Sequence, residues 1–519
     1  MNDIKMEKAM HDTVGSEMPE EPIQLYKKRD KIHPKRARGT FRRFKWIVMA
    51  VTLAIYYVTP WLRWDRGEFA PDQAVLVDIA NRRFYAFFVE IWPQEFYFVA
   101  GMLVMAGIGL FLVTSVVGRA WCGYTCPQTV WTDLFLVVER YFEGDRNARI
   151  KLDKAPWNWD KIRKRSLKHI TWIMIAIATG GAWIFYFADA PTLFVDLFTG
   201  QAAFVAYATV AILTATTYTF GGHMREQVCN YMCPWPRVQA AMLDEESLVV
   251  TYNDWRGEPR THGRKKAAKA GIPQGDCIDC NACVQVCPAG IDIREGQQME
   301  CITCALCIDA CDEIMDKVGL QRGLISYSTL HDYNANMAMA SDPASGTLNP
   351  DLVRTSDGQF KPEIRHFHWK RFFRPRTLLY FAAWAGLGLA LLFALSQRDR
   401  LEVNVQHDRN PVFVTLKDGS IRNGYTVKLL NMIPEERTVE LSVSGLPRSE
   451  VRINGIEARA DGRFFIELEP DKVRALRVYV SQNLDGTTPI SQRFALTVED
   501  RQSNEIDTYE TVFSGPGEN

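Results

Sequence analysis

The chain has 519 residues, 47% of them hydrophobic, and its 61 basic and 61 acidic side chains cancel to a formal net charge of zero. This length corresponds to roughly three domains, and the balanced charge gives no indication of binding to nucleic acid. All twelve cysteines lie between Cys122 and Cys311. This placement argues against a disulfide scaffold, which spreads cysteines through a small secreted domain, and favours metal or redox chemistry in one region.

Five apolar runs of about 20 residues predict membrane-spanning helices. They cover residues 44–62, 96–117, 170–188, 202–220 and 378–395. The last run lies within the segment 376–396, which is predicted to be the fifth membrane span. The fourth run is rich in threonine, so a buried core helix or a re-entrant segment is the alternative there. With its four spans, the segment 44–240 is predicted to form a membrane domain.

Lysine and arginine near the spans predict the orientation, because these residues are retained on the cytoplasmic side. Residues 1–43 are basic and contain no early apolar stretch, so we expect a disordered cytoplasmic arm and not a cleaved signal peptide. The loop 118–168 is also basic, whereas the loop 189–201 has no lysine or arginine. Five spans then place residues 241–375 in the cytoplasm and residues 400–519 on the far side of the membrane.

The strongest signal is a pair of C-x2-C-x2-C-x3-C runs, "CIDCNACVQVCP" and "CITCALCIDACD". This spacing is typical of bacterial ferredoxins and predicts two 4Fe-4S clusters in a ferredoxin-like α+β domain. The fourth cysteine of each run is expected to bind the other cluster. One cluster is thus predicted on Cys277, Cys280, Cys283 and Cys311, and the second on Cys301, Cys304, Cys307 and Cys287. A pair of zinc knuckles is the alternative, but zinc sites seldom use eight cysteines in this doubled spacing.

Two adjacent clusters transfer single electrons and bind no organic substrate themselves. The sequence contains no G-x-x-x-x-G-K-[ST] loop and no G-x-G-x-x-G after a strand, so neither a nucleotide site nor a dinucleotide site is indicated. The electron donor must therefore be another molecule. A soluble ferredoxin, a flavoprotein and a quinol are the three candidates.

Two C-x3-C-P motifs, "CGYTCP" and "CNYMCP", follow the second and fourth spans. Cysteines at i and i+4 lie on one side of a helix, and the proline marks its end or a kink. The topology brings four thiols to one membrane face: Cys122, Cys126, Cys229 and Cys233. They could bind Cu(I), bind a further iron–sulfur cluster or act as dithiol relays; the alternative is that they are small buried hydrophobic residues. His223, Met224 and Met232 flank the second pair and could add ligands.

After residue 400 the chain shows short alternating segments, "VFVTL", "YTVKLL", "TVELSV", "FFIEL" and "LRVYVS". Turn signals such as "KDGS", "RNG" and "NG" separate them. This pace predicts an immunoglobulin-like β-sandwich at residues 400–519, without the disulfide of antibody domains. Such a domain is more often a docking module than a catalyst.

From the first span onward, the sequence resembles the cytochrome c oxidase accessory proteins of the CcoG, FixG and RdxA family. The resemblance rests on the five spans, the paired C-x3-C-P motifs, the stretch "CPAGIDIREGQQMECITCALCIDACDE" and the opening of the sandwich, "DRNPVFVTLKDGSIRNGYTVKLLN". It implies a multi-pass protein of the bacterial inner membrane that is needed to assemble cbb(3)-type haem–copper oxidase. The expected partners are oxidase assembly factors and copper chaperones, and the protein could also form a homodimer.

The resemblance further implies a cupric reductase that supplies Cu(I) for the copper centre of the oxidase. The residues fit this role, because clusters beside soft thiols can reduce Cu(II) and hold the product. We therefore expect electrons to enter the ferredoxin clusters and to reach copper near the four thiols of the C-x3-C-P motifs. Two alternatives stay open: a polyferredoxin subunit of a quinol-linked respiratory chain, and a redox-sensing assembly scaffold without turnover.

Overall fold

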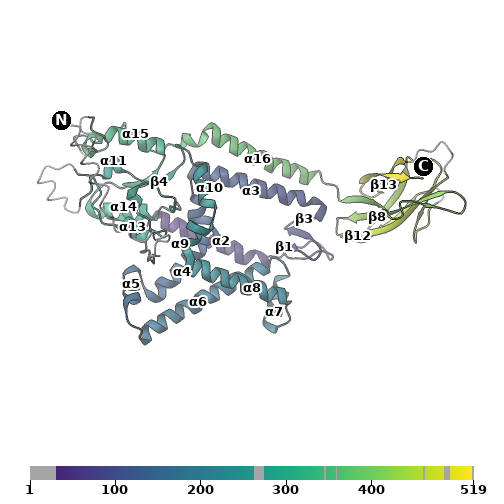
Figure 1. Ribbon diagram of the computed structural model, residues 1–519, viewed down its shortest axis with the longest axis horizontal. Helices are drawn as coiled ribbons and strands as arrows, with labels where there is room; N and C mark the ends of the chain where they lie inside the picture. Colours follow the sequence, from purple (N-terminus) through teal and green to yellow (C-terminus); the bar gives the residue numbers. More distant parts are fainter. Residues whose placement is uncertain are drawn as a thin grey trace, which may run out of the picture.

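The computed structural model describes residues 31–261, 274–343, 347–357, 359–459, 462–483 and 491–516. The molecule is elongated, and a bundle of long helices separates an α+β domain at one end from a β-sandwich at the other (Figure 1). We call these two ends the cluster end and the sandwich end. This architecture confirms the fold class predicted from the sequence.

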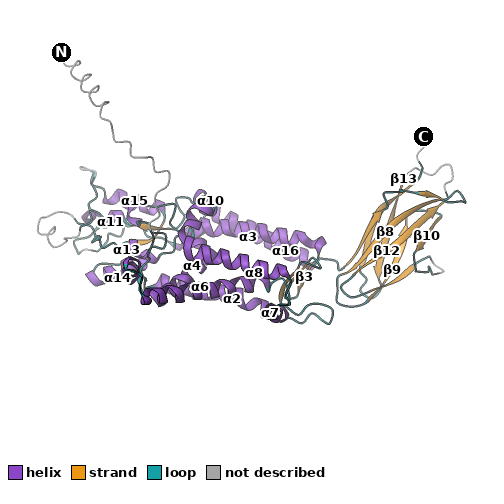
Figure 2. Ribbon diagram, turned by 60° about the horizontal axis from the view of Figure 1, so that its bottom comes forward, coloured by secondary structure: helices purple, strands orange, loops and turns teal. Residues whose placement is uncertain are grey.

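Within the described part of the chain, five helical segments are long and apolar enough to cross a membrane, as predicted. They are Thr40–Trp61, Pro93–Val117, Trp159–Ile184, Phe204–Met232 and Pro375–Ser396. Figure 2 shows their helices α2 (Thr40–Val58), α3 (Phe96–Val117), α6 (Trp159–Ile184), α8 (Phe204–Thr217) and α16 (Pro375–Ser396) running between the two ends. Helix α3 packs against α16, and α6 packs against α8.

The third span starts earlier than the sequence predicted. Helix α6 begins at Trp159 because the Asn158 side chain caps its first turn and accepts the backbone N–H of Lys161 at 2.8 Å. The basic residues before 170 therefore continue the apolar helix as an amphipathic extension at the cluster end.

The fourth span runs past its predicted end at residue 220. Helix α8 continues through the π-helical turn η4 (Tyr218–Met224), the short α9 (Arg225–Gln227) and a second π turn, η5 (Val228–Met232). A further π turn, η3 (Trp121–Thr125), follows α3. The turns η3 and η5 hold the first cysteine of each C-x3-C-P motif, which is notable because π turns are found frequently at functional sites.

Each C-x3-C-P motif ends its π turn as the sequence predicted. Cys126 stands between η3 and α4 (Pro127–Glu143), and Pro127 is the first residue of that helix, where its missing N–H costs no hydrogen bond. Cys233 likewise ends η5, and α10 (Trp235–Met242) follows. The remaining connecting helices are α5 (Arg146–Lys154) and α7 (Ala190–Thr199).

The α+β domain at the cluster end contains both ferredoxin-type cysteine runs. Strand β4 (Val249–Tyr252) pairs with β5 (Ile325–Ser328) in an antiparallel register that sets Val249 opposite Ser328. Helix α13 (Ala282–Val286) carries Cys283 and ends just before Cys287, and α14 (Leu306–Val318) carries Cys307 and Cys311. The smaller helices are α11 (Asp254–Gly257), η6 (Ile293–Glu295), α15 (Leu330–Ala340), η7 (Pro350–Val353) and η8 (Trp369–Phe373).

Part of the basic N-terminal arm is ordered. Residues 1–30 of the predicted arm lie outside the described residues. Residues 31–39 are extended, with the Lys35 N–H donating to the Gln285 carbonyl at 2.7 Å and the Arg36 N–H donating to Asp145 at 3.0 Å. For this part the expectation of disorder was wrong, because both the backbone and the charges find partners on the cluster end.

The sandwich end begins with a sheet that the sequence analysis did not predict. Strands β1 (Val75–Asp78), β2 (Arg83–Ala86) and β3 (Val89–Ile91) form a three-stranded antiparallel sheet after the first span. This sheet touches the β-sandwich, since Arg83 donates to the carbonyl of Asp471. The sandwich is therefore fixed to the membrane domain by more than its covalent link to α16.

The predicted immunoglobulin-like sandwich is confirmed as two antiparallel sheets. One has the order β10-β12-β8-β6, with β7 paired to β8, and the other has the order β11-β9-β13-β14. The strands are β6 (Leu401–His407), β7 (Val414–Thr415), β8 (Ile421–Asn431), β9 (Arg437–Ser444), β10 (Ser449–Ile453), β11 (Phe464–Leu468), β12 (Val473–Gln482), β13 (Ser491–Asp500) and β14 (Ile506–Ser514). Alternate residues such as Tyr425, Val427 and Val478 fill the core between the sheets.

One predicted turn of the sandwich was wrong. The "RNG" triplet lies inside strand β8 and not between strands. Its Gly424 is required for another reason, because a Cβ there would lie 2.4 Å from the carboxylate of Asp408. The glycine thus makes room for a side chain that packs across the strand.

Candidate iron–sulfur and thiol site

The two ferredoxin-type loops share one backbone conformation. In each loop the residues before and after the second cysteine have positive φ: Asp279 and Asn281 in the first, with φ of 52° and 57°, and Thr303 and Ala305 in the second, with φ of 56° and 58°. Non-glycine residues rarely adopt this left-handed conformation. Its repetition at equivalent positions indicates that both loops are bent to turn three thiols toward one centre.

The structure brings the fourth cysteine of each run to the thiols of the other run. Burial, together with the nearby thiols of Cys283, Cys277 and Cys280, raises the pKa of Cys311. Burial also raises the pKa of Cys287 to about 12, with Cys304 and Cys301 as neighbouring thiols. This is the grouping that the predicted ligand exchange requires.

The residues present fit two 4Fe-4S clusters. Eight soft sulfur donors lie in two groups of four, which is the ligand number that each cubane needs. Half of these cysteines are buried, and burial raises the pKa of Cys307 well above its usual value, so cluster binding must displace protons from such thiols. When bound, such clusters supply one-electron storage.

Charged residues that the sequence analysis missed fix the first loop. Arg294 donates to the carboxylate of Asp292 at 2.6 Å and also reaches Asp279 and Asn281 inside the loop. Its guanidinium is nearly buried, so these bonds hold the loop in its bent form. Nothing in the sequence distinguishes this arginine from its neighbours, because its partners are set by the folded loop.

The first C-x3-C-P motif packs directly on the second cluster loop. A Cβ at Gly123 would lie 2.7 Å from the carbonyl oxygen of Ile302 and 3.1 Å from the Cα of Cys304. The hydroxyl of Tyr124 donates to the Cys304 carbonyl at 3.2 Å. The middle of the motif is therefore a contact surface for the loop that carries three of the predicted ligands.

The four thiols of the two C-x3-C-P motifs lie near one another at the membrane edge of the α+β domain. Burial and the thiols of Cys126, Cys229 and Cys233 raise the pKa of Cys122 to about 12. The Cys122 thiol donates to the side-chain oxygen of Gln239 at 3.0 Å, a partner that the sequence analysis missed. The other three thiols are partly exposed, so a ligand can reach them.

These thiols are neighbours and not the closed shell of one metal ion. Among the described residues, no group of three or more His, Cys, Asp or Glu side chains is placed to hold a single metal ion. The flanking His223, which the sequence offered as a further ligand, has its ring beside those of Tyr218 and Trp172. A metal at this site would thus draw the two motifs together.

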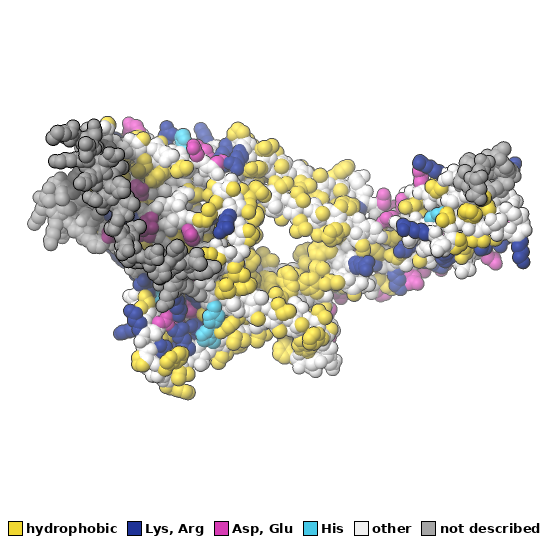
Figure 3. Space-filling view, in the orientation of Figure 1, with side chains coloured by type: hydrophobic (Ala, Val, Ile, Leu, Met, Phe, Trp, Pro, Cys, Tyr) yellow, Lys and Arg dark blue, Asp and Glu magenta, His cyan; other side chains and the backbone are white. Residues whose placement is uncertain are grey.

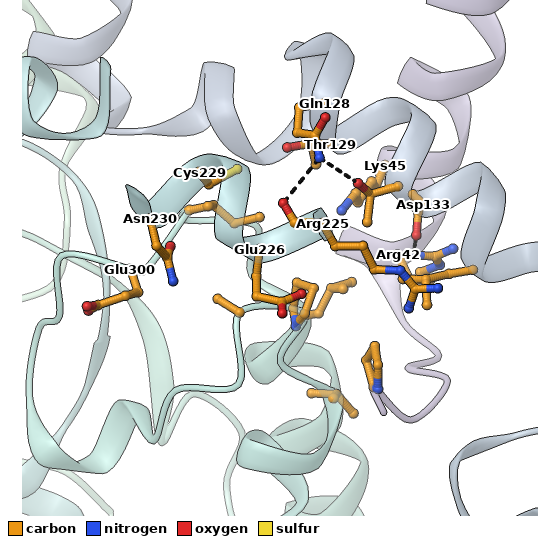
Figure 4. Close-up of a pocket in the computed structure, with 18 of the residues that line it drawn as sticks. Arg42, Lys45, Gln128, Thr129, Asp133, Arg225, Glu226, Cys229, Asn230 and Glu300 are labelled. Atoms are coloured by element: carbon orange, nitrogen blue, oxygen red, sulfur yellow. Dashed lines mark hydrogen bonds and ion pairs between the residues drawn. The ribbon is translucent and has the colours of Figure 1, made fainter. Parts of the chain in front are cut away.

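A small cavity, lined by both charged and apolar residues, lies beside the second motif (Figure 4). Its volume is about 50 Å³, and it is bounded by α2, α4, α9 and the α+β domain. Figure 4 shows Cys229 and Glu300 on one side and Arg42 with Asp133 on the other, the latter two joined by an ion pair of 2.8 Å. The cavity is large enough for a few water molecules between the thiols and the α+β domain.

Three family models match the chain. Residues 224–330 match a 4Fe-4S dicluster domain, and residues 98–141 match a 4Fe-4S binding domain. Residues 391–516 match the model of the Ig-like fold at the C-terminus of FixG. The chain therefore carries 4Fe-4S binding domains, and the second of these models includes the first C-x3-C-P motif.

The relatives match over nearly the whole chain. The nitrogen fixation protein FixG of Rhizobium meliloti is 65% identical, over 95% of this chain and 94% of its own. Protein RdxB of Cereibacter sphaeroides is 52% identical, over 95% of this chain and 98% of its own. A crystal structure of a FixG-related protein from Vibrio parahaemolyticus covers 23% of this chain and 98% of its own, at 20% identity and a TM-score of 0.20. The chain thus belongs to the FixG/RdxA family of membrane proteins with 4Fe-4S domains.

Proposed function

We propose that this iron–sulfur protein reduces Cu(II) to Cu(I) during the assembly of a cbb(3)-type cytochrome c oxidase. The observation that carries the proposal is the packing of the first C-x3-C-P motif on the second cluster loop, with Gly123 against Ile302 and Cys304. The loop that carries three predicted ligands of one cluster is thereby held against the motif that carries Cys122 and Cys126. Soft thiolates favour Cu(I), so the same site can accept an electron on copper and retain the product.

Each thiol has a distinct part in this proposal. Cys277, Cys280, Cys283 and Cys311 hold one cluster, and Cys287, Cys301, Cys304 and Cys307 hold the other. Copper enters through the partly exposed Cys126, Cys229 and Cys233. The buried Cys122, whose thiol donates to the side-chain oxygen of Gln239, must lose its proton as the metal binds.

The orientation and the partners belong to the same proposal. The lysines and arginines of the loops at the cluster end support a cytoplasmic position for that end. The sandwich would then lie in the periplasm and bind an assembly factor of the oxidase or a copper chaperone. The apolar core of the sandwich is mostly buried, so contacts with such a partner would form at the edge strands β10, β11 and β14.

The test is anaerobic reduction of Cu(II), measured with a chelator specific for Cu(I). Cluster-reduced protein, freed of excess reductant, is compared with a variant in which Cys122, Cys126, Cys229 and Cys233 are all serine. Tyr231→Phe serves as the control within the second motif, because that side chain is 81% exposed. We expect wild type and Tyr231→Phe to reduce copper at equal rates, and the serine variant to keep its iron and lose the activity.

The other outcomes separate the alternatives. Equal activity of the serine variant would move copper reduction away from these thiols. Reduction of only as many copper ions as the clusters store, without turnover, would indicate a redox sensor. No copper reduction by any sample would overturn the proposal in favour of a respiratory electron-transfer subunit.

A further inference from the structure

A large apolar cavity lies among the membrane helices. Its volume is about 1,050 Å³, and helices α2, α6, α7 and α8 line it with residues that include Tyr57, Gly181, Phe194 and Tyr207. The volume is at the upper end of that of small-molecule sites. Several wall residues are exposed, Met174 by 64% and Phe198 by 80%, so the cavity opens toward the lipid and a lipid-soluble molecule can enter it.

Polar groups close the cavity at the cluster end. Tyr218 lines it, and the Tyr218 hydroxyl lies 2.9 Å from Nδ1 of His169 on α6. The ring of His223 stacks on that of His169, with centroids 5.8 Å apart. Figure 3 shows histidine side chains at the border between a basic patch and the apolar surface of the helices. The cavity thus ends at the hydroxyl of Tyr218, with the imidazoles of His169 and His223 behind it.

The cations next to this group are already paired. Lys168 lies 2.8 Å from Glu143, and Arg225 lies 2.6 Å from Glu139. A phospholipid phosphate prefers cations that it can pair with itself. The Tyr218 hydroxyl and the imidazoles behind it instead suit an uncharged ring with oxygen atoms on it, attached to a long apolar tail.

We propose that this cavity binds a membrane quinol, with its ring at Tyr218 and His169 and its isoprenoid tail along α6 and α8. The proposal rests on the proposed function and names the electron donor for it. One quinol loses two electrons and two protons and becomes a quinone, while two Cu(II) ions gain one electron each and become two Cu(I) ions. The two protons leave to water at the cluster end, where the exposed His223 can pass them on.

The chain itself links this site to the thiols. His223 and Cys229 are six residues apart, on the consecutive π turns η4 and η5, and the backbone bends between them at Arg225, with φ of 31°. Arg225, between them, sits 5.5 Å from the ring centroid of Trp172, which also contacts His169 and His223. The ring of a bound quinol would therefore lie close to the second C-x3-C-P motif.

The proposal is tested by equilibrium binding of radiolabelled decylubiquinone to the full-length protein in phosphatidylglycerol and phosphatidylethanolamine nanodiscs. A substitution at Gly181 tests the cavity directly, because Gly181 lines it and a Cβ there meets no atom within 4 Å. Gly181→Leu places a branched side chain in the cavity, and its Cβ meets no neighbouring atom. Gly386→Leu, on α16 and equally free of neighbours, is the matched control.

We expect saturable binding to wild type and to Gly386→Leu, and at least about tenfold weaker binding to Gly181→Leu. Tyr218→Phe removes only the hydroxyl and should weaken binding about three- to tenfold, as expected for one lost hydrogen bond. Binding that is unchanged in both Gly181→Leu and Tyr218→Phe, or native phospholipid that decylubiquinone does not displace, would overturn the quinol site.

Copper reduction is measured on the same samples with dithionite-reduced protein and, separately, with decylubiquinol. Failure with decylubiquinol alone, together with no quinone binding, overturns the quinol site and leaves the proposed function intact. Saturable quinone binding without copper reduction from either donor overturns the proposed function and leaves the binding site standing.

Discussion

Gly123 gives the first C-x3-C-P motif a structural role beyond that of its two cysteines. Its missing side chain lets the backbone of η3 rest on the backbone of the second cluster loop, and backbone atoms cannot move aside as a flexible side chain can. We expect Gly123→Ala to lower the free energy of unfolding by about 1 to 3 kcal/mol, as overpacking does. Copper reduction should fall with it, because motif and loop are forced apart.

Calorimetry and the copper assay measure the two effects together. Gly107→Ala on α3 is the control, since a Cβ there meets no atom within 4 Å. A Gly123→Ala protein as stable and as active as wild type would show that the close approach is dispensable.

The predicted exchange of cluster ligands also belongs to single residues. If Cys287 binds with Cys301, then Cys287→Ser and Cys301→Ser damage the same cluster, and the double variant should lose no more iron than either single one. Each should retain roughly half of the iron of a protein with two equal clusters. Cys287→Ser combined with Cys277→Ser should instead lose both clusters. Iron analysis and low-temperature electron paramagnetic resonance distinguish this from ligation within each run, in which Cys287 and Cys277 share a cluster.

Among the elements, those with a strong periodic or apolar signal were predictable. The spans, the cysteine runs and the sandwich all repeat a pattern over many residues. Strands β1 to β3 were not found, because each has only three or four residues and "VEI" or "RFYA" carries little alternation. The extra turns of the fourth span were missed because glycine and charge at its end, Gly221 to Glu226, read as a loop in the sequence.

Some contacts in the candidate site were likewise predictable from the sequence, and others were not. The meeting of the two C-x3-C-P motifs follows from topology and was predicted. The contact of Gly123 with Ile302 and the bond from Cys122 to Gln239 depend on how two elements dock, and no spacing in the sequence encodes a docking angle.

The junction between α14 and α2 allows a prediction at the element scale. The Asp309 carboxylate accepts the N–H groups of Phe41 and Arg42, at 3.2 and 2.7 Å, and so caps the first membrane helix from another domain. Asp309→Ala leaves these donors without a partner and should lower the free energy of unfolding by about 1 to 2 kcal/mol.

Hydrogen exchange of the amides at the start of α2 reports the effect directly, and exchange there should accelerate in Asp309→Ala. Asp316→Ala on the same helix is the control, because Asp316 pairs with Arg322 in solvent, where a salt bridge is worth little. Equal exchange in all three proteins would show that Asp309 does not stabilise the start of α2.

For the whole molecule, the contact between the three-stranded sheet and the sandwich is sensitive to pH. Burial and the carboxylate of Asp471 raise the pKa of Glu90 to about 7, while Arg83 and Arg398 oppose the shift. The docked state therefore holds a proton that the undocked chain releases above its ordinary pKa of 4.5. Its stability is greatest below that value and falls as the pH rises through about 7.

Exchange of the β2 and β3 amides, corrected for intrinsic rates, should thus be slower at about pH 5.5 than at about pH 7.5. Glu90→Gln is neutral at both pH values and should abolish most of the difference. A pH dependence that persists in this variant would assign the effect to another group.

Helix α16 has 22 residues, so at roughly 1.5 Å per residue it spans about 33 Å, slightly more than the hydrocarbon core of a bilayer. It connects the α+β domain to the sandwich, and a helix of this length, if it crosses the bilayer, holds the two on opposite faces. Under the proposed function, Cu(I) formed at the thiols and a partner bound to the sandwich would then be separated by the membrane. The copper would have to be carried across by another protein.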